Sequence, residues 1–158
     1  MIIIVSGTPG TGKTILAKRL AKSMKYIHLD LKKLISKNKL KESYDKKRKC
    51  YIIDIKKMNK ILIEKIKKSK NMVIDSHLSH YLPKKYVDLC IITKCNLKIL
   101  EKRLKKRKYN EDKIRENLDC EIFDVCLNEA REAGHKILVI DTTKGIKINK
   151  VIKKIKLK

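Results

Sequence analysis

The stretch Ile2-Ile3-Ile4-Val5-Ser6-Gly7-Thr8-Pro9-Gly10-Thr11-Gly12-Lys13-Thr14 decides the fold, because it places G-x-x-x-x-G-K-T directly after an apolar run. This pattern is typical of a phosphate-binding loop at the turn between a strand and a helix. Gly10 and Gly12 let backbone N–H groups approach an anion, and the positive end of the following helix dipole faces the same point. We expect Lys13 to reach the β- and γ-phosphates of a bound ligand and Thr14 to offer its hydroxyl to Mg²⁺.

Apolar runs of strand length recur along the chain and show little alternation with polar residues. They cover residues 2–5, 72–74, 87–92 and 137–140, with 26–29 as a shorter fifth candidate. Such runs are typical of strands buried on both faces of a parallel sheet. Helical periodicity covers 12–24, 54–69, 96–106, 111–133 and 145–156. The alternation predicts an α/β P-loop NTPase fold, a five-stranded parallel sheet with helices on both faces, in a single domain spanning 1–158.

Two segments interrupt this alternation. Residues 30–53 are polar, strongly basic and only weakly periodic, so we expect a small, mobile helical insertion rather than part of the sheet. Residues 107–112 break the apolar pattern between two helices and predict a short flap.

An acid follows the apolar run at 72–74. Asp75 should lie at the same carboxyl edge of the sheet as the phosphate loop, where it could hold Mg²⁺ opposite Thr14, directly or through a water. The alternative is that Asp75 caps the turn that follows. His77 could orient a water, hydrogen-bond Asp75 or touch a phosphate, whereas a structural role is the alternative for both His77 and His80.

Arginine is rare in this lysine-rich chain, which has six arginines, four of them between residues 103 and 131. Arg103 and Arg107 are spaced i, i+4 and so share a helix face that ends at the predicted flap. Their guanidinium groups could grip the transferring phosphoryl group as the flap closes, although two solvated helix charges are the alternative. Arg115 and Arg131 can equally pair with nearby glutamates.

The segment Asp141-Thr142-Thr143-Lys144-Gly145 follows the last predicted strand. Its backbone could hold a purine at the carboxyl edge of the sheet, and we include Lys144 among the nucleotide-binding candidates. A plain turn or a helix N-terminus explains the same residues nearly as well.

The formal net charge is +25, and the five cysteines form no C-x-x-C pair. The charge could attract RNA or another polyanion, or it could reflect a composition in which lysine alternates with isoleucine over a solvated surface. The odd cysteine count argues against a zinc cage and a secreted disulfide scaffold. No apolar stretch approaches the roughly 20 residues that span a bilayer. We therefore expect a cytoplasmic protein with no membrane partner.

Together these motifs resemble a known family, the short-lid adenylate kinases of archaea and eukaryotes, or adenylate kinase 6-like family. The resemblance extends in family order from residue 2 to about 145. It rests on Gly7-Thr8-Pro9-Gly10-Thr11-Gly12-Lys13-Thr14, Tyr44-Asp45, Ile53-Asp54, Asp75-Ser76-His77, Arg103-Leu104 through Arg107-Lys108-Tyr109-Asn110, and Glu116-Asn117-Leu118-Asp119-Cys120-Glu121-Ile122-Phe123.

The resemblance implies a monomeric, Mg-dependent enzyme that converts ATP and AMP into two ADP, with a monophosphate-binding segment near 30–53 and a lid near 106–116. It also implies an ATPase role in assembly of the small ribosomal subunit, with binding to a small-subunit ribosomal protein or rRNA. By position, Arg107 resembles the lid arginine that contacts ATP. Gly10, Gly12, Lys13, Thr14 and Ile15 resemble the phosphate-loop contacts.

The chain departs from the family pattern at three positions. Lys108 stands where the family usually has glycine, and Ile15 replaces the common second threonine. Ser36 occupies the place of an arginine in the monophosphate segment, with the nearby basic residues Lys33, Lys37 and Arg48 as substitutes. The acceptor therefore stays open to another nucleoside monophosphate, and a kinase of a small metabolite such as shikimate is a further alternative.

Overall fold

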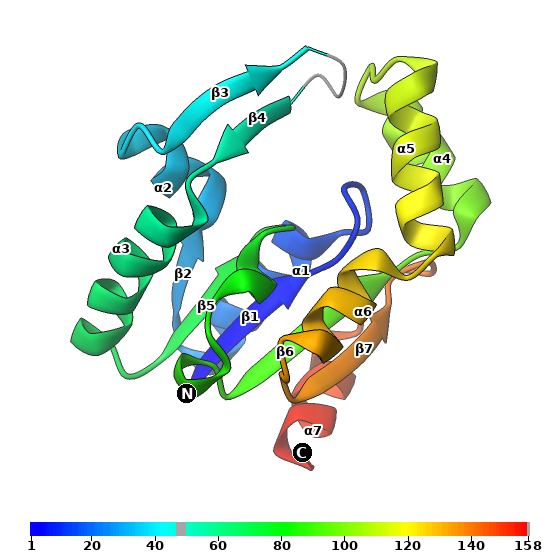
Figure 1. Cartoon of the computed structure of the whole chain (residues 1–158). Helices are drawn as coiled ribbons and strands as arrows, with labels where there is room; N and C mark the ends of the chain where they lie inside the picture. The colour runs from blue at the N-terminus through cyan, green and yellow to red at the C-terminus, as the bar shows by residue number, and fades with distance from the viewer. Residues whose placement is uncertain (47–49, 158) are drawn as a thin grey trace.

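The computed structural model describes residues 1–46 and 50–157. Its centre is a five-stranded sheet in the order β2 (Ile27–Asp30), β5 (Met72–Asp75), β1 (Ile2–Ser6), β6 (Leu89–Lys94) and β7 (Ile137–Asp141) (Figure 1). The pairings within this sheet are parallel, which confirms the predicted α/β sheet. The chain crosses to either side of β1, and ligands of such sheets bind beyond the carboxyl ends of the strands at this reversal.

Helices cover both faces of the sheet, as predicted. Their bounds are α1 (Lys13–Met24), α2 (Leu31–Lys37), α3 (Ile55–Lys68), α4 (Leu97–Lys106), α5 (Glu111–Ile122), α6 (Val125–Glu132) and α7 (Ile148–Lys156). Successive side chains of a strand point to opposite faces of the sheet, so β1 contributes residues to two hydrophobic cores, one on each face. Ile2 and Ile4 pack in a cluster with α2, α3 and α6, whereas Ile3 and Val5 pack with α1 and α7.

The inserted segment 30–53 is not purely helical, which corrects the sequence prediction. After α2 the chain forms an antiparallel pair of strands, β3 (Lys41–Asp45) and β4 (Cys50–Ile53). Tyr44 lies opposite Tyr51, and their ring centroids are 5.0 Å apart. Such aromatic cross-strand pairs stabilise a two-stranded ribbon, but the exposed lysines around them hide the period of the strands. Arg48 lies outside the described residues.

The helix predicted over 111–133 is two helices, α5 and α6. The break falls at Asp124, whose φ of 54° is left-handed. Aspartate tolerates this conformation better than most residues because its short polar side chain can bond locally. The Asp124 carboxylate is held here by a residue distant in the sequence, since Lys94 Nζ lies 2.5 Å from it. The apolar period of α5 and α6 runs through the break, so the pattern alone does not reveal it.

Two arms extend beyond the carboxyl edge of the sheet. The β3–β4 ribbon lies on one side of the loop between β1 and α1, and the α4–α5 pair lies on the other (Figure 1). Leu100, Leu104, Ile114 and Cys95 form the small core that joins α4 to α5. Within residues 1–46 and 50–157, no helix is both long enough and apolar enough to cross a membrane.

Candidate active site

The loop between β1 and α1 requires glycine at specific points. Gly7, Gly10 and Gly12 have φ values of 136°, 95° and 89°, which other residues rarely adopt. A Cβ atom on Gly7 would lie 2.6 Å from the carbonyl oxygen of Thr93, and one on Gly10 would lie 2.7 Å from Leu100. The loop is therefore packed tightly against the end of β6 and the first turns of α4.

The Lys13 ammonium is hydrogen-bonded to the backbone of this loop. Its Nζ atom donates to the carbonyl oxygens of Gly7 at 2.7 Å and Thr8 at 2.9 Å. Burial is the main reason that the pKa of Lys13 falls to about 8, and the nearby Arg107 guanidinium acts in the same direction. A bound anion would oppose both effects, so the loop is prepared for a phosphate.

Asp75 joins the phosphate loop to β2. Its carboxylate is 4% exposed and accepts a hydrogen bond from the Thr14 hydroxyl at 2.5 Å. The other carboxylate oxygen lies 2.6 Å from Nε2 of His28. The turn after β5 is bonded instead by Ser76, whose Oγ accepts from the N–H of Leu78 at 3.1 Å. Asp75 thus faces Thr14, and Ser76 rather than Asp75 caps the turn that follows β5.

The donor set at this point fits Mg²⁺. The cation prefers oxygen, and it binds one or two carboxylates together with waters and substrate phosphates. The Thr14 hydroxyl and the Asp75 carboxylate converge next to the loop that would hold those phosphates. His28 contacts the carboxylate from the opposite side and can orient it, as outer partners of metal ligands do.

The two histidines after β5 have different surroundings. His80 is buried, with Nδ1 2.7 Å from the Ser6 hydroxyl and Nε2 2.9 Å from the Glu129 carboxylate. His77 keeps contact with solvent, yet the protein around it lowers its pKa to about 4, with further lowering by Lys13 and other lysines. His80 therefore ties β1 to α6, whereas His77 is a neutral imidazole near the phosphate loop.

The two candidate arginines lie at different depths. Arg103 donates to the carbonyl oxygens of Thr142 at 3.0 Å and Gly10 at 3.4 Å, so its guanidinium lies against the backbone of the site. Arg107 is the exposed C-cap residue of α4, close enough to Lys13 to lower the pKa of that lysine. Lys108 follows it with a left-handed φ of 56° at the turn that leads to α5.

The loop after β7 contacts the phosphate loop directly. The Thr142 hydroxyl donates to the carbonyl oxygen of Thr11 at 2.6 Å. The same hydroxyl lies 3.0 Å from the carbonyl oxygen of Lys94. Lys144 is exposed two residues further on, and Ile15 in the first turn of α1 is 61% exposed. The sequence patterns did not identify His28, and they placed Thr142 in a candidate loop without a role for its side chain, because both side chains act through neighbours distant in the chain.

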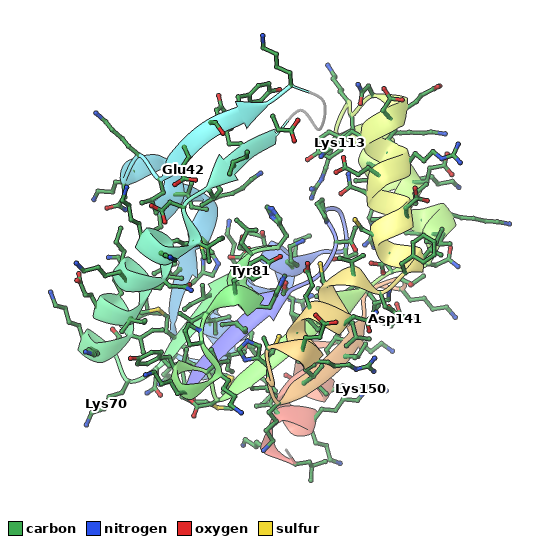
Figure 2. The ribbon with its side chains drawn as sticks, viewed as in Figure 1. Glu42, Lys70, Tyr81, Lys113, Asp141 and Lys150 are labelled. Carbon is green, nitrogen blue, oxygen red and sulfur yellow. The ribbon has the colours of Figure 1, made fainter. Side chains whose placement is uncertain are left out.

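Lys113 extends the site on the side of α5 that faces the β3–β4 ribbon (Figure 2). Its ammonium lies 2.7 Å from the Glu116 carboxylate. Lys113 of α5 and Lys32 of α2 both add to the lowering of the His77 pKa, so their positive charges reach the space around His77 from two different helices.

Comparisons with known proteins show which proteins this chain is similar to. A family model described as an AAA domain matches residues 3–124. The chain is 38% identical over 139 residues to the adenylate kinase isoenzyme 6 homolog of Dictyostelium discoideum, covering 88% of this chain and 79% of that protein. The protein of the same name from Caenorhabditis elegans is 32% identical over 138 residues, covering 87% and 76%.

A solved structure shares the fold. Shikimate kinase from Acinetobacter baumannii, in complex with shikimate, has a TM-score of 0.67 and covers 99% of this chain and 91% of its own, at 15% identity. At that identity the likeness concerns architecture alone, because one fold supports many substrates.

Proposed function

Because the chain belongs to the adenylate kinase isoenzyme 6 family, we propose that it is an ATP:AMP phosphotransferase that yields two ADP. The main support is the convergence of Lys13, Thr14 and Asp75 at the carboxyl edge of the sheet. Fold likeness to a shikimate kinase does not favour a metabolite acceptor, since it is limited to architecture.

The phosphate loop would hold the triphosphate of ATP. Lys13 would exchange its bonds to the carbonyl oxygens of Gly7 and Thr8 for bonds to the β- and γ-phosphates. Backbone N–H groups at the start of α1 would point at the same anion. The exposed Ile15 side chain and the loop that carries Lys144 would border the base of the nucleotide.

Thr14 and Asp75 would hold Mg²⁺ in this complex. The bound cation supplies charge neutralisation at the β- and γ-phosphates. His28 keeps the Asp75 carboxylate oriented throughout.

The acceptor phosphate would lie in the space around His77. The positive charges of Lys32 on α2 and Lys113 on α5 act on this space. They can take the place of the arginine that the family carries where this chain has Ser36. A phosphate monoester has a second pKa of about 6, so its attacking oxygen is already ionised at neutral pH. Transfer therefore needs positioning and charge stabilisation rather than a base, and Arg107 supplies part of that charge as the lid closes.

A panel of acceptors tests this proposal. ADP formation from Mg-ATP is measured alone and with AMP, CMP, UMP, GMP or shikimate. We expect strong stimulation by AMP. Stimulation by another monophosphate alone would show that this monophosphate, and not AMP, is the acceptor. Stimulation by shikimate would show that the acceptor is a metabolite and not a nucleotide. Stimulation by none of them would reject the kinase proposal.

The position of His77 favours a second activity, hydrolysis of ATP. Water, unlike AMP, must be oriented for attack, and the neutral imidazole of His77 can accept a hydrogen bond from it. We propose that this ATPase activity serves small ribosomal subunit assembly, with a small-subunit ribosomal protein or rRNA as partner. The net charge of +25 is consistent with an rRNA partner.

The variant His77→Ala separates the two activities. We expect it to lower hydrolysis while AMP-dependent transfer continues, and loss of neither activity would remove His77 from the mechanism. His135→Ala is a poor control because that ring is buried, so the exposed Lys150→Ala on α7, which has no place in the proposed site, is the control variant. Binding to a small-subunit rRNA fragment should weaken steeply with salt, and no binding at physiological salt would reject the rRNA partner.

A further inference from the structure

Glu121 is a buried acid at the end of α5. The residue is 4% exposed, and Thr8 in the phosphate loop is 1% exposed. One carboxylate oxygen of Glu121 accepts a hydrogen bond from the Thr8 hydroxyl at 2.6 Å. The other accepts from the backbone N–H of Cys95, at the junction between β6 and α4, at 2.8 Å. A single carboxylate therefore joins α5, the phosphate loop and the end of β6.

Lys94 neutralises this buried carboxylate. Its Nζ atom lies 3.3 Å from Glu121 Oε1 and donates to the Glu121 carbonyl oxygen at 2.7 Å. It also lies 2.5 Å from the Asp124 carboxylate at the break between α5 and α6. A lysine at the last carbonyl groups of a helix is favourable. The carboxyl end of α5 is thereby fixed to β6.

Thr8 is the centre of hydrogen bonding inside the loop. Its carbonyl oxygen accepts from Lys13 Nζ at 2.9 Å, from the Thr11 hydroxyl at 2.7 Å and from the Thr11 N–H at 3.2 Å. A shift of Thr8 would therefore displace the turn at Thr11, which belongs to the loop that binds phosphate. Among the described residues, the hydrogen bond to Glu121 is the one interaction that holds the side chain of Thr8 in place.

We propose that Glu121 is a positioning residue that holds Thr8, and through it the turn at Thr11, in the geometry that binds the triphosphate. This inference rests on the proposed use of the phosphate loop for ATP. The 12 residues of α5 span about 18 Å, so the lid turn at the far end can move while the end at Glu121 stays fixed to the loop.

The first test compares Thr8→Val with Thr8→Ser. Valine keeps the shape of the side chain and removes the hydroxyl, whereas serine keeps the hydroxyl. Affinity for the non-hydrolysable β,γ-imido analogue of ATP is measured by calorimetry with Mg²⁺. We expect Thr8→Val to weaken affinity roughly 10- to 100-fold, as loss of a hydrogen bond to a charged group does, and Thr8→Ser to restore most of it. Equal affinity in the valine variant, or equal loss in both, would overturn the proposal.

The second test is a double-mutant cycle with Glu121→Gln. If the two side chains act as a pair, the double variant should bind the ATP analogue no more weakly than the worse single variant. Additive losses would contradict the pairing. Asp119→Asn, which removes a charge from the exposed side of α5, is the control. Should Glu121→Gln not fold, as judged by circular dichroism, the comparison of valine with serine at Thr8 decides alone.

These binding measurements do not depend on an acceptor. If the wild-type protein fails to phosphorylate any monophosphate but the loss in Thr8→Val holds, the kinase proposal fails and the role of Glu121 stands. If AMP-dependent transfer occurs and Thr8→Val binds normally, the role of Glu121 fails alone.

Discussion

His28 Nε2 lies 2.6 Å from the Asp75 carboxylate, which links β2 to the last residue of β5. The link exists because β2 pairs with β5 in parallel, with Asp30 opposite Asp75. The other oxygen of the carboxylate is thus left to face Thr14 at 2.5 Å. One histidine therefore determines how the proposed metal-binding acid is oriented.

Removal of this histidine should weaken metal binding. We expect His28→Ala to raise the Mg²⁺ concentration for half-maximal phosphoryl transfer by roughly 10-fold, as loss of an outer partner of a metal ligand does. Calorimetry of the ADP complex as a function of Mg²⁺ checks the same effect without turnover. The exposed Asn71→Ala near the other end of β5 is a control. An unchanged Mg²⁺ requirement would exclude an orienting role for His28.

Arg107 should act mainly on transfer. Its guanidinium lies at the exposed end of α4, where it can stabilise charge on the transferring phosphoryl group only when the lid is closed. We expect Arg107→Ala to lower kcat by roughly 10³-fold while sparing much of the ATP affinity. Single-turnover kinetics measure this loss, with the exposed Arg115→Ala on α5 as the matched control. Equal losses in both variants would indicate a general charge effect.

Lys108 carries backbone strain at the lid turn. Its φ of 56° is left-handed, a conformation that costs a non-glycine residue about 1 kcal/mol or more. Lys108→Gly should relieve this strain, and after the entropy cost of glycine the free energy of unfolding should rise by up to about 1 kcal/mol. Urea denaturation measures the change. Lys102→Gly inside α4 should instead destabilise by about 1 kcal/mol, and similar losses at both positions would contradict the strain.

The buried His80 should make stability depend on pH. Burial lowers its pKa below the ordinary 6.5, and His135 and Lys13 act in the same direction against the opposing Glu129 carboxylate. As pH falls below about 6.5, the unfolded chain binds a proton that the folded protein does not, so the free energy of unfolding decreases.

Urea midpoints at pH 7.5 and pH 5.5 measure this dependence. We expect the wild-type midpoint to fall between these values and the fall to be smaller in His80→Gln, which lacks the titrating group. His77→Gln gives the comparison for the second histidine with a lowered pKa. A fall of the same size in His80→Gln would show that His80 is not responsible.

Sequence patterns predict most of the sheet because its strands are buried on both faces. A strand that is buried on both faces needs a continuous apolar run, and such runs are visible in the sequence. The glycines of the phosphate loop marked the turn between β1 and α1. The β3–β4 ribbon escaped prediction because Tyr44, Tyr51 and Ile52 are roughly half exposed, so no apolar period marks its strands. The break at Asp124 depends on a partner, Lys94, that lies thirty positions away in the sequence.

The site was predictable to the extent that it follows from the sheet edge. Thr14 and Asp75 end up together because parallel strands bring their carboxyl ends to one edge. The contacts of the His28 and Thr142 side chains were not predictable, although the loop that carries Thr142 was a candidate, since these contacts depend on which strands are neighbours and on loops that meet across the site. The pairing of Glu121 with Thr8 spans 113 positions and had no local signal.

The most direct measurement of the central claim uses ATP labelled at the γ-phosphoryl group, with Mg²⁺ and AMP in excess. The label can appear in ADP, by transfer to AMP, or in inorganic phosphate, by transfer to water. We expect nearly all of it in ADP, with Lys13→Ala giving neither product. Label found only in inorganic phosphate, at a rate that AMP does not change, would contradict the assignment of this chain as an adenylate kinase.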